Sequence, residues 1–452
     1  MQTGNESSQT QARLLELNKA LESGTYNQMR SMLNGLNAPA SAHLLESSPP
    51  KVRNILWNLF DAEHQSHVLQ HLNEDVLTDL LVTKNTEALL SVLENIDSDD
   101  LTDILQQLPD TVTQQVINAM DAQNRARVEN LLSYPEDTAA GLMNTDTISV
   151  RPRFTLDVVF RYLRRHTELP DMTDNIFVVN RLDEYVGLLP ITKLLVSDPS
   201  MTVREIMSTE IDPIPADLSD QEVANLFERY DLVSAPVIDA SGKLLGRITI
   251  DDVVDVIRES ADHSLLGMAG LDEDDDTFAP IFKTARRRAF WLGANLITAF
   301  IASAVINIFE ETIVKVVALA VLMPIVASMG GVAGSQTLTL VIRSMALGQI
   351  GEANSSWFFN RELAVGALNG LFWAAVVAIV TSMVFQDLTL GFIIAMAMVI
   401  NLITAAVAGV SLPMILKSYG IDPAIAGTVV LTTITDVVGF MSFLGLATIY
   451  YS

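Results

Sequence analysis

The sequence predicts a multidomain protein: an acidic all-α superhelical N-domain, an α/β tandem repeat, and an α-helical membrane domain with five transmembrane helices per subunit. Charge is the first observation behind this prediction. Residues 1–282 hold 47 acidic and 20 basic side chains, whereas residues 283–452 hold seven and eight. The second observation is five long apolar segments within the nearly neutral part, and the third is a strand–helix pattern that occurs twice before them.

The composition excludes several functional classes. The chain has no cysteine, so it has no disulfide, thiolate metal site, iron–sulfur cluster or cysteine nucleophile. Its net charge of −26 would repel phosphate backbones, so we expect no nucleic-acid partner. No apolar stretch follows the polar N-terminus, which predicts that no secretory signal is cleaved. Neither a Walker motif nor a Ser–His–Asp arrangement stands out, so we expect no enzyme activity.

After a disordered N-terminus (1–10), residues 11–135 predict the all-α N-domain. Apolar positions with helical spacing recur after Pro, Asp or Ser starts, as in Val52–Phe60, Leu101–Leu108 and Val112–Met120. Short helices at nearly regular spacing are typical of a superhelical interaction platform.

One helix of this domain carries three histidines on one face. His64, His67 and His71 are spaced i, i+3 and i+7, so a transition metal could bridge them. No carboxylate completes the set at an obvious spacing, so a solvated polar face is the preferred explanation of the pattern.

A β-α-β-β-α pattern occupies residues 136–200 and again 201–257. Its paired strands are expected at 176–179 and 185–189 in the first copy, and at 235–238 and 244–249 in the second. The tandem unit resembles a cystathionine-β-synthase (CBS) domain pair, a regulatory module that commonly binds adenine nucleotides or metal ions.

The adenine signature of such modules, Gly-x-x-Thr/Ser-x-x-Asp, is present in the second copy only. There it reads Gly246, Thr249 and Asp252, whereas the first copy has Gly187 followed by Pro190 and Lys193. Thr249 and Asp252 are therefore candidate ATP-binding residues that the first repeat does not support.

Residues 258–282 form a connecting helix and acidic linker. Asp252, Asp255 and Glu259 are about one turn apart and share a helix face, and Asp272–Asp276 follow in the linker. Such carboxylates repel one another unless cations bridge them, and Mg²⁺ prefers oxygen ligands. A solvated linker is the alternative for the acidic run.

Residues 283–452 predict the membrane domain. Each of the five apolar segments exceeds the roughly 20 residues that cross a bilayer. They are Ala289–Phe309, Val316–Ile342, Leu363–Gln386, Leu388–Leu416 and Pro423–Tyr451.

Basic residues flanking the segments predict their orientation. Six lie on one side, and only Lys315 lies on the other. The six are Arg286, Arg287, Arg288, Arg343, Arg361 and Lys417. Because basic loops stay in the cytoplasm, we expect the soluble part inside the cell, the spans in the inner membrane and the C-terminus outside.

Asp436 is the only acidic residue deep inside any predicted span, and no Lys or Arg lies at comparable depth. It should therefore face water, a cation or another subunit, unless it is protonated and hydrogen-bonded. Paired carboxylates of this kind suit a pore for hydrated divalent cations. Gly330, Gly331, Gln336 and Asn401 are candidate pore-lining residues, with close helix packing as the alternative.

The whole arrangement resembles the MgtE family of magnesium channels over nearly the full chain. The resemblance rests on residues 132–143, 251–256 and 422–424, on Pro324 with Gly330 and Gly331, and on residues 435–439. It implies a homodimer in the bilayer, a pore at the subunit interface with Asp436 as its ion site, and closure by cytoplasmic Mg²⁺. The implied sensor acids are Asp99, Asp100 or Asp103 in the N-domain, Asp231, Asp252 and Asp255 in the CBS pair, and Glu259 in the connecting helix.

Two departures from the family pattern leave alternatives open. Val332 occupies a position where the family commonly has Asn, so the chain could carry another divalent cation, such as Co²⁺ or Mn²⁺, or act as an exchanger. The connecting helix has fewer acids than usual and includes His263, which suggests weaker or pH-sensitive gating. A membrane-tethered metal or nucleotide sensor that does not conduct is the alternative from another class.

Overall fold

The computed structural model describes residue 33 and residues 35–451, except 82–85, 94–95, 97, 107, 167–168, 171, 272–276 and 352–353. The expected disordered N-terminus and the acidic run Asp272–Asp276 lie outside these residues. The chain divides into two compact units, Met1–Arg258 with Asp274–Pro280, and Glu259–Glu273 with Ile281–Ser452.

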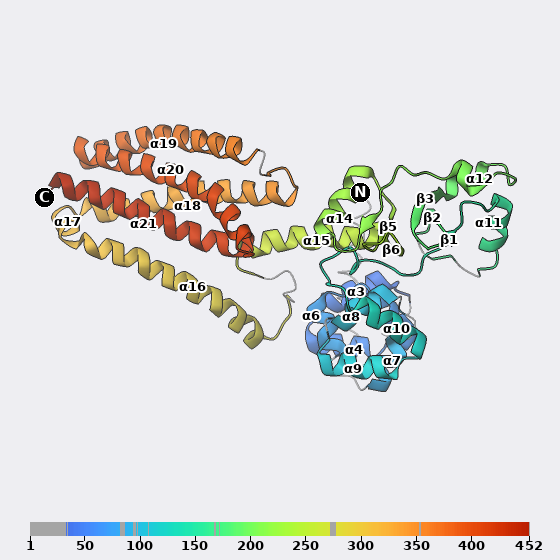
Figure 1. Cartoon of the computed structure of the whole chain (residues 1–452). Coiled ribbons are helices and arrows are strands. Elements are labelled where there is room, and N and C mark those ends of the chain that lie inside the picture. Colours follow the sequence, from blue (N-terminus) through green and yellow to red (C-terminus); the bar gives the residue numbers. More distant parts are fainter. Residues whose placement is uncertain are drawn as a thin grey trace. The chain divides into compact units, whose positions relative to one another are not determined.

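The first unit begins with an array of helices of eight to ten residues (Figure 1). They are α3 (Ala38–Glu46), α4 (Pro50–Trp57), α5 (Ala62–Leu69), α6 (Glu74–Leu81), α7 (Thr86–Leu93), α8 (Ser98–Gln106), α9 (Asp110–Ala119) and α10 (Ala122–Leu131). Side-chain caps start two of them, since Asn37 accepts from the Ala40 N–H (3.1 Å) and Asp61 from the His64 N–H (2.9 Å). Because helices this short are not stable alone, one shared apolar core that includes Trp57 stabilises the array.

Two three-stranded sheets follow, and they have the same topology. In each, the first strand is parallel to the second, and the second is antiparallel to the third. The first repeat contains β1 (Ser149–Val150), α11 (Leu156–Leu163), β2 (Asn175–Val179), β3 (Tyr185–Pro190) and α12 (Ile191–Val196). The second contains α13 (Val203–Ile206), β4 (Ile214–Pro215), α14 (Asp220–Tyr230), β5 (Ser234–Ile238), β6 (Leu244–Thr249) and α15 (Ile250–Gly267).

A short segment of each repeat pairs through backbone hydrogen bonds with a strand of the other repeat. Asn144, which precedes β1, exchanges backbone hydrogen bonds with Arg247 on β6, and Ser208 does the same with Leu188 on β3. A Cβ on Gly246 would lie 2.6 Å from the Asn144 carbonyl oxygen, and only glycine permits that approach. The crossed pairing fixes the two repeats as one module.

The second unit contains five helices long and apolar enough to cross a membrane. They are α16 (Ile281–Ile308), α18 (Ala318–Ala346), α19 (Ser355–Phe385), α20 (Leu388–Ser418) and α21 (Pro423–Tyr451), with the short α17 (Glu310–Lys315) after the first. At about 1.5 Å per residue, each exceeds the roughly 30 Å hydrocarbon core. Helix α20 is the most buried of the five and packs against α18, α19 and α21. The expected fold class is therefore confirmed.

Candidate functional site

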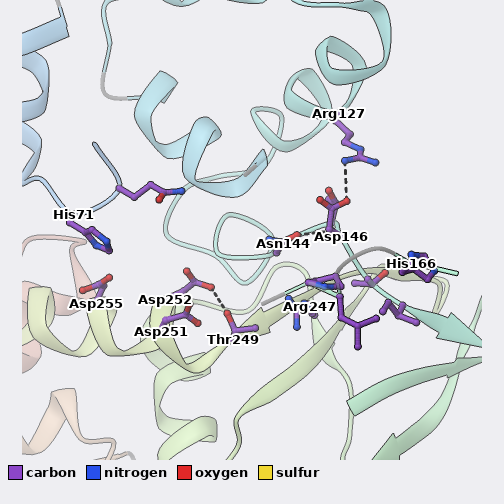
Figure 2. Close-up of a pocket in the computed structure, with 16 residues that line it drawn as sticks. His71, Arg127, Asn144, Asp146, His166, Arg247, Thr249, Asp251, Asp252 and Asp255 are labelled. Carbon is purple, nitrogen blue, oxygen red and sulfur yellow. Dashed lines mark hydrogen bonds and ion pairs between the residues drawn. The ribbon is translucent and has the colours of Figure 1, made fainter. Parts of the chain in front are cut away.

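A polar pocket of about 830 Å³ lies in the first unit, and its walls come from distant parts of the sequence (Figure 2). The array of short helices contributes His71 and Arg127, the segment before β1 contributes residues 144–148, and the junction of β6 and α15 contributes residues from Arg247 to Asp255. Carboxylates and cationic side chains thus face one cavity.

Three carboxylates of this pocket lie in the first two turns of α15. Asp251, Asp252 and Asp255 follow β6 directly, and acidic side chains are favourable at a helix N-terminus. Thr249 precedes the helix and donates its hydroxyl to Asp252 Oδ2 at 3.1 Å. The two residues expected to bind a nucleotide therefore also hold the start of the helix together.

His71 lies near Asp255 in the same pocket (Figure 2). Partial burial lowers the pKa of His71 below its ordinary value, and the charge of Asp255 opposes that shift. A histidine with a lowered pKa is mostly neutral near pH 7, so it adds little positive charge beside the carboxylate.

The opposite wall of the pocket is built around Asp146. Arg127 on α10 pairs with this carboxylate at 3.0 Å, and Asn144 Oδ1 accepts from the Asp146 N–H at 2.6 Å. Asn144 is itself fixed to β6 through its backbone pairing with Arg247. This wall therefore ties the helical array to both repeats.

The structure brings only some of the expected sensor acids together. Asp252 and Asp255 share the pocket, whereas Asp231 is the exposed C-cap of α14 and does not line it. Glu259 continues along α15 and is exposed. Asp99, Asp100 and Asp103 lie on α8, and their side chains are outside the described part of the chain. Among described residues, no three His, Asp or Glu side chains form a preformed metal cluster.

The three histidines of the sequence pattern have separate surroundings. His64 Nε2 lies 2.9 Å from Ser41 Oγ, and its ring lies 4.9 Å from that of Phe60. His71 instead lines the pocket. The part of the chain that the structure describes therefore offers no support for a shared transition metal.

In the second unit, Asp436 lies on α21 and is partly exposed. Its carboxylate makes no hydrogen bond or ion pair with any described residue. Gln336 on α18 is exposed, and a Cβ on Gly331 would meet nothing within 4 Å. These three residues have room for a ligand or a neighbour, and their pore-lining role stays a prediction.

Asn401 on α20 is fully buried between two other helices. Its Nδ2 donates to the Val326 carbonyl of α18 at 2.8 Å, while its Oδ1 is buried with no hydrogen-bond partner among described residues. A Cβ on Gly330 would lie 2.2 Å from this Nδ2, and one on Gly439 would lie 2.8 Å from it. Asn401 therefore links helices in this subunit.

Glu362 was missed by the sequence analysis. It is 5% exposed on α19, accepts from Arg361 Nη1 at 2.5 Å and lies 3.4 Å from Thr337 Oγ1. The predicted span began at Leu363, but α19 begins at Ser355, so Glu362 lies within a candidate span. Glu362 is the eighth residue of α19 and lies near one end of the helix, so the expectation that Asp436 is the only acidic residue deep inside a span stays a prediction. If the predicted helix had been allowed to begin with the polar residues before Leu363, it would have included Glu362.

The C-terminal part of α15 belongs to the second unit and contacts the start of α21. His263 Nε2 pairs with Asp422 Oδ2, and Asp422 Oδ1 also accepts from the Ala424 N–H at 2.7 Å. Gly267 packs against Ala424 and Ile425. Asp422 thus caps one helix and holds the other.

Comparison with known proteins matches three family models along the chain. The model of the MgtE intracellular N domain matches residues 36–137, the CBS domain model matches 203–259, and the MgtE divalent cation transporter model matches 323–446. Together they follow the order of the helical array, the second repeat and the membrane helices.

Similar proteins match over almost their whole length. The magnesium transporter MgtE of Thermus thermophilus is 29% identical over 96% of this chain and 97% of its own. That of Bacillus subtilis is 27% identical over 95% of each chain. The crystal structure of the cytosolic domain of the Mg²⁺ channel MgtE in complex with ATP is 32% identical, with a TM-score of 0.50, over 54% of this chain and 99% of that one.

Proposed function

The chain belongs to the MgtE family of divalent cation transporters, and from this premise we propose that it conducts Mg²⁺ into the cell as a homodimer that cytoplasmic Mg²⁺ closes. It is a multi-pass membrane protein with a cytosolic soluble domain, and it is a transporter rather than an enzyme. In the proposed topology, the C-terminus lies outside.

Asp436 carries the pore assignment. A carboxylate within an apolar helix is unfavourable unless a partner compensates its charge, and no described residue does so. In a homodimer two such carboxylates could face one axis. Mg²⁺ suits that arrangement, because it dehydrates reluctantly and can be held through its waters.

The pore assignment is tested by Mg²⁺ flux into liposomes that contain the purified full chain. Asp436→Asn and Asp436→Ala should reduce uptake to the level of empty liposomes. Glu311→Gln, a change of an exposed acid on α17, is the matched control and should leave uptake unchanged. Wild-type uptake by Asp436→Ala would refute the assignment.

The pocket at the start of α15 supports the proposed gating. Asp251, Asp252 and Asp255 gather there without a preformed metal cluster among described residues, so their mutual repulsion falls when cations bridge or screen them. The test measures flux in liposomes while Mg²⁺ is varied on the cytoplasmic side. The Mg²⁺ concentration that half-closes the channel should be higher for the Asp255→Asn variant than for wild type. Glu228→Gln, at an exposed position of α14, should leave the required Mg²⁺ concentration unchanged. An unchanged midpoint for Asp255→Asn would contradict the proposal.

ATP binding is proposed for the same pocket. Thr249 and Asp252 carry the adenine signature, and the similar cytosolic domain was crystallised with ATP. Calorimetric titration of ATP into the full chain should show binding that Thr249→Val weakens.

Val332 favours a second candidate function, in which the chain transports another divalent cation such as Co²⁺ or Mn²⁺. This apolar side chain is 56% exposed on α18, where the family pattern has a polar Asn. Competition by Co²⁺ and Mn²⁺ in the flux assay decides whether Mg²⁺ is the preferred ion.

A further inference from the structure

Four arginines converge on a second cavity of the soluble unit, which has a volume of about 750 Å³. Arg151 and Arg153 follow β1, Arg181 lies in the turn between β2 and β3, and Arg204 lies on α13. Because β1 and β2 are parallel, their C-terminal ends meet at one edge of the sheet. The acidic pocket instead takes residues 144–148, which precede β1, and the two cavities share no lining residue among those that the structure describes.

The charge of this cavity is opposite to that of its surroundings. Residues 1–282 contain only 20 basic side chains against 47 acidic ones, yet four of the 20 line a cavity whose described lining residues include no acid. Arg153, Arg181 and Arg204 form no ion pair with any residue that the structure describes. Clustered guanidinium groups repel one another, so the arrangement is unfavourable unless an anion binds.

Arg151 provides a second, independent observation. Its Nη2 pairs with Asp183 at 2.7 Å, but its Nη1 is buried and has no hydrogen-bond acceptor among the described residues. A buried N–H group without an acceptor is rare in folded proteins. Arg151 can therefore donate one further hydrogen bond from Nη1.

The backbone around the arginines is held in place. Asn180 Oδ1 accepts from the N–H groups of Leu182 (2.8 Å) and Glu184 (3.1 Å), which fixes the turn that carries Arg181. The Arg204 N–H donates to the Pro152 carbonyl at 3.0 Å, which joins α13 to the segment after β1. The four guanidinium groups thus project from a preorganised frame.

We propose that this cavity binds a small anion with two or more phosphoryl groups. The planar guanidinium fork matches phosphate oxygens in pairs, and several forks favour several phosphoryl groups over one. The volume lies within the range usual for small-molecule sites. A long nucleic acid does not fit this chemistry, because the acidic remainder of the unit would repel it.

Pyrophosphate is the probe for this site, and the full chain in phosphatidylcholine nanodiscs is the sample. Isothermal titration should show pyrophosphate binding at least tenfold tighter than orthophosphate. Arg181→Ala with Arg204→Ala should weaken pyrophosphate binding about 100-fold, since two charge-assisted contacts are lost. Both arginines are exposed, so folding should not change.

Arg165→Ala with Arg229→Ala is the control, because it removes the same charge from exposed positions outside the cavity. It should change the affinity less than twofold. Absent binding, or equal affinities for the two double variants, would overturn the proposal. So would loss of binding in Arg247→Ala with retention in Arg181→Ala/Arg204→Ala, because the anion would then occupy the acidic pocket.

Phosphatidylglycerol nanodiscs distinguish a free solute from a lipid headgroup. A soluble ligand predicts the same pyrophosphate affinity in both nanodiscs. A tenfold weaker apparent affinity with phosphatidylglycerol, absent in the arginine double variant, would identify a headgroup as the occupant and overturn the assignment to a free solute.

Discussion

Replacing Gly330 by alanine should destabilise the membrane unit through one buried side chain. The added Cβ would lie 2.2 Å from Asn401 Nδ2 and 2.8 Å from its Cγ. Asn401 is fully buried and has little room to move, and its shift would break the 2.8 Å hydrogen bond to the Val326 carbonyl. Overpacking of a core costs about 1–3 kcal/mol. A lost hydrogen bond adds about 1 kcal/mol.

The expected loss is therefore about 2–4 kcal/mol of unfolding free energy. For a unit of this size, that corresponds to a fall of about 5–15 °C in Tm. Thermal unfolding of the purified full chain in detergent, followed by tryptophan fluorescence, measures the change. Gly445→Ala is the control: its Cβ would meet only Phe309 Cζ at 3.9 Å, so its Tm should stay near wild type.

The double variant isolates the cause. In an Asn401→Ala background the obstructing amide is gone, so Gly330→Ala should cost at least about 1.5 kcal/mol less than it does alone. Equal costs in the two backgrounds, or an unchanged Tm for Gly330→Ala, would refute the reasoning. That result would mean that Asn401 does not occupy the space beside Gly330.

Three further predictions concern other parts of the chain. The Tyr451 hydroxyl donates to Asp387 at 2.8 Å, which lowers the pKa of Asp387 below its ordinary value of 3.8. The stability that this bond adds should be present above pH 3.8 and lost as pH falls through the lowered pKa, so below pH 3.8 the Tm of wild type should fall more steeply than that of Asp387→Asn. Removal of the His263–Asp422 pair by His263→Ala should speed proteolysis of the linker before α16 severalfold, whereas His166→Ala should not. Millimolar Mg²⁺ should slow proteolysis of the wild-type linker, and equal cleavage with Mg²⁺ and with excess chelator would contradict cation-dependent closure.

Local patterns predicted the elements of this fold well, because hydropathy and strand–turn signals act over short stretches. All five apolar segments are helices, and the repeated β-α-β-β-α order is confirmed. The boundaries were less accurate. Helix α19 begins at Ser355 because polar residues can occupy the first turns of a long helix, and the span predicted from Leu363 therefore left out Glu362.

Contacts between distant segments were not predictable in this way. The signature at Gly246 suggested a ligand, but the structure adds a second reason for that glycine, the close approach of the Asn144 carbonyl. Asn401 was expected as a pore or packing residue, and only the folded helices show which atoms surround it. Sequence spacing cannot give such contacts, because they depend on helix packing and on crossed strands.

Net charge also fails to predict which charged side chains come together in the folded protein. An excess of 27 acids over residues 1–282 predicts an acidic surface, and one pocket does gather Asp251, Asp252 and Asp255. The same unit also brings four arginines from segments up to 53 positions apart to one cavity, and no basic run in the sequence predicts this cluster. Because charges beyond about 10 Å are screened at 0.1 M salt, each cavity responds to its own lining rather than to the total. A single acidic unit can therefore hold both a pocket that gathers carboxylates after β6 and a separate cavity that gathers arginines at the C-terminal ends of β1 and β2.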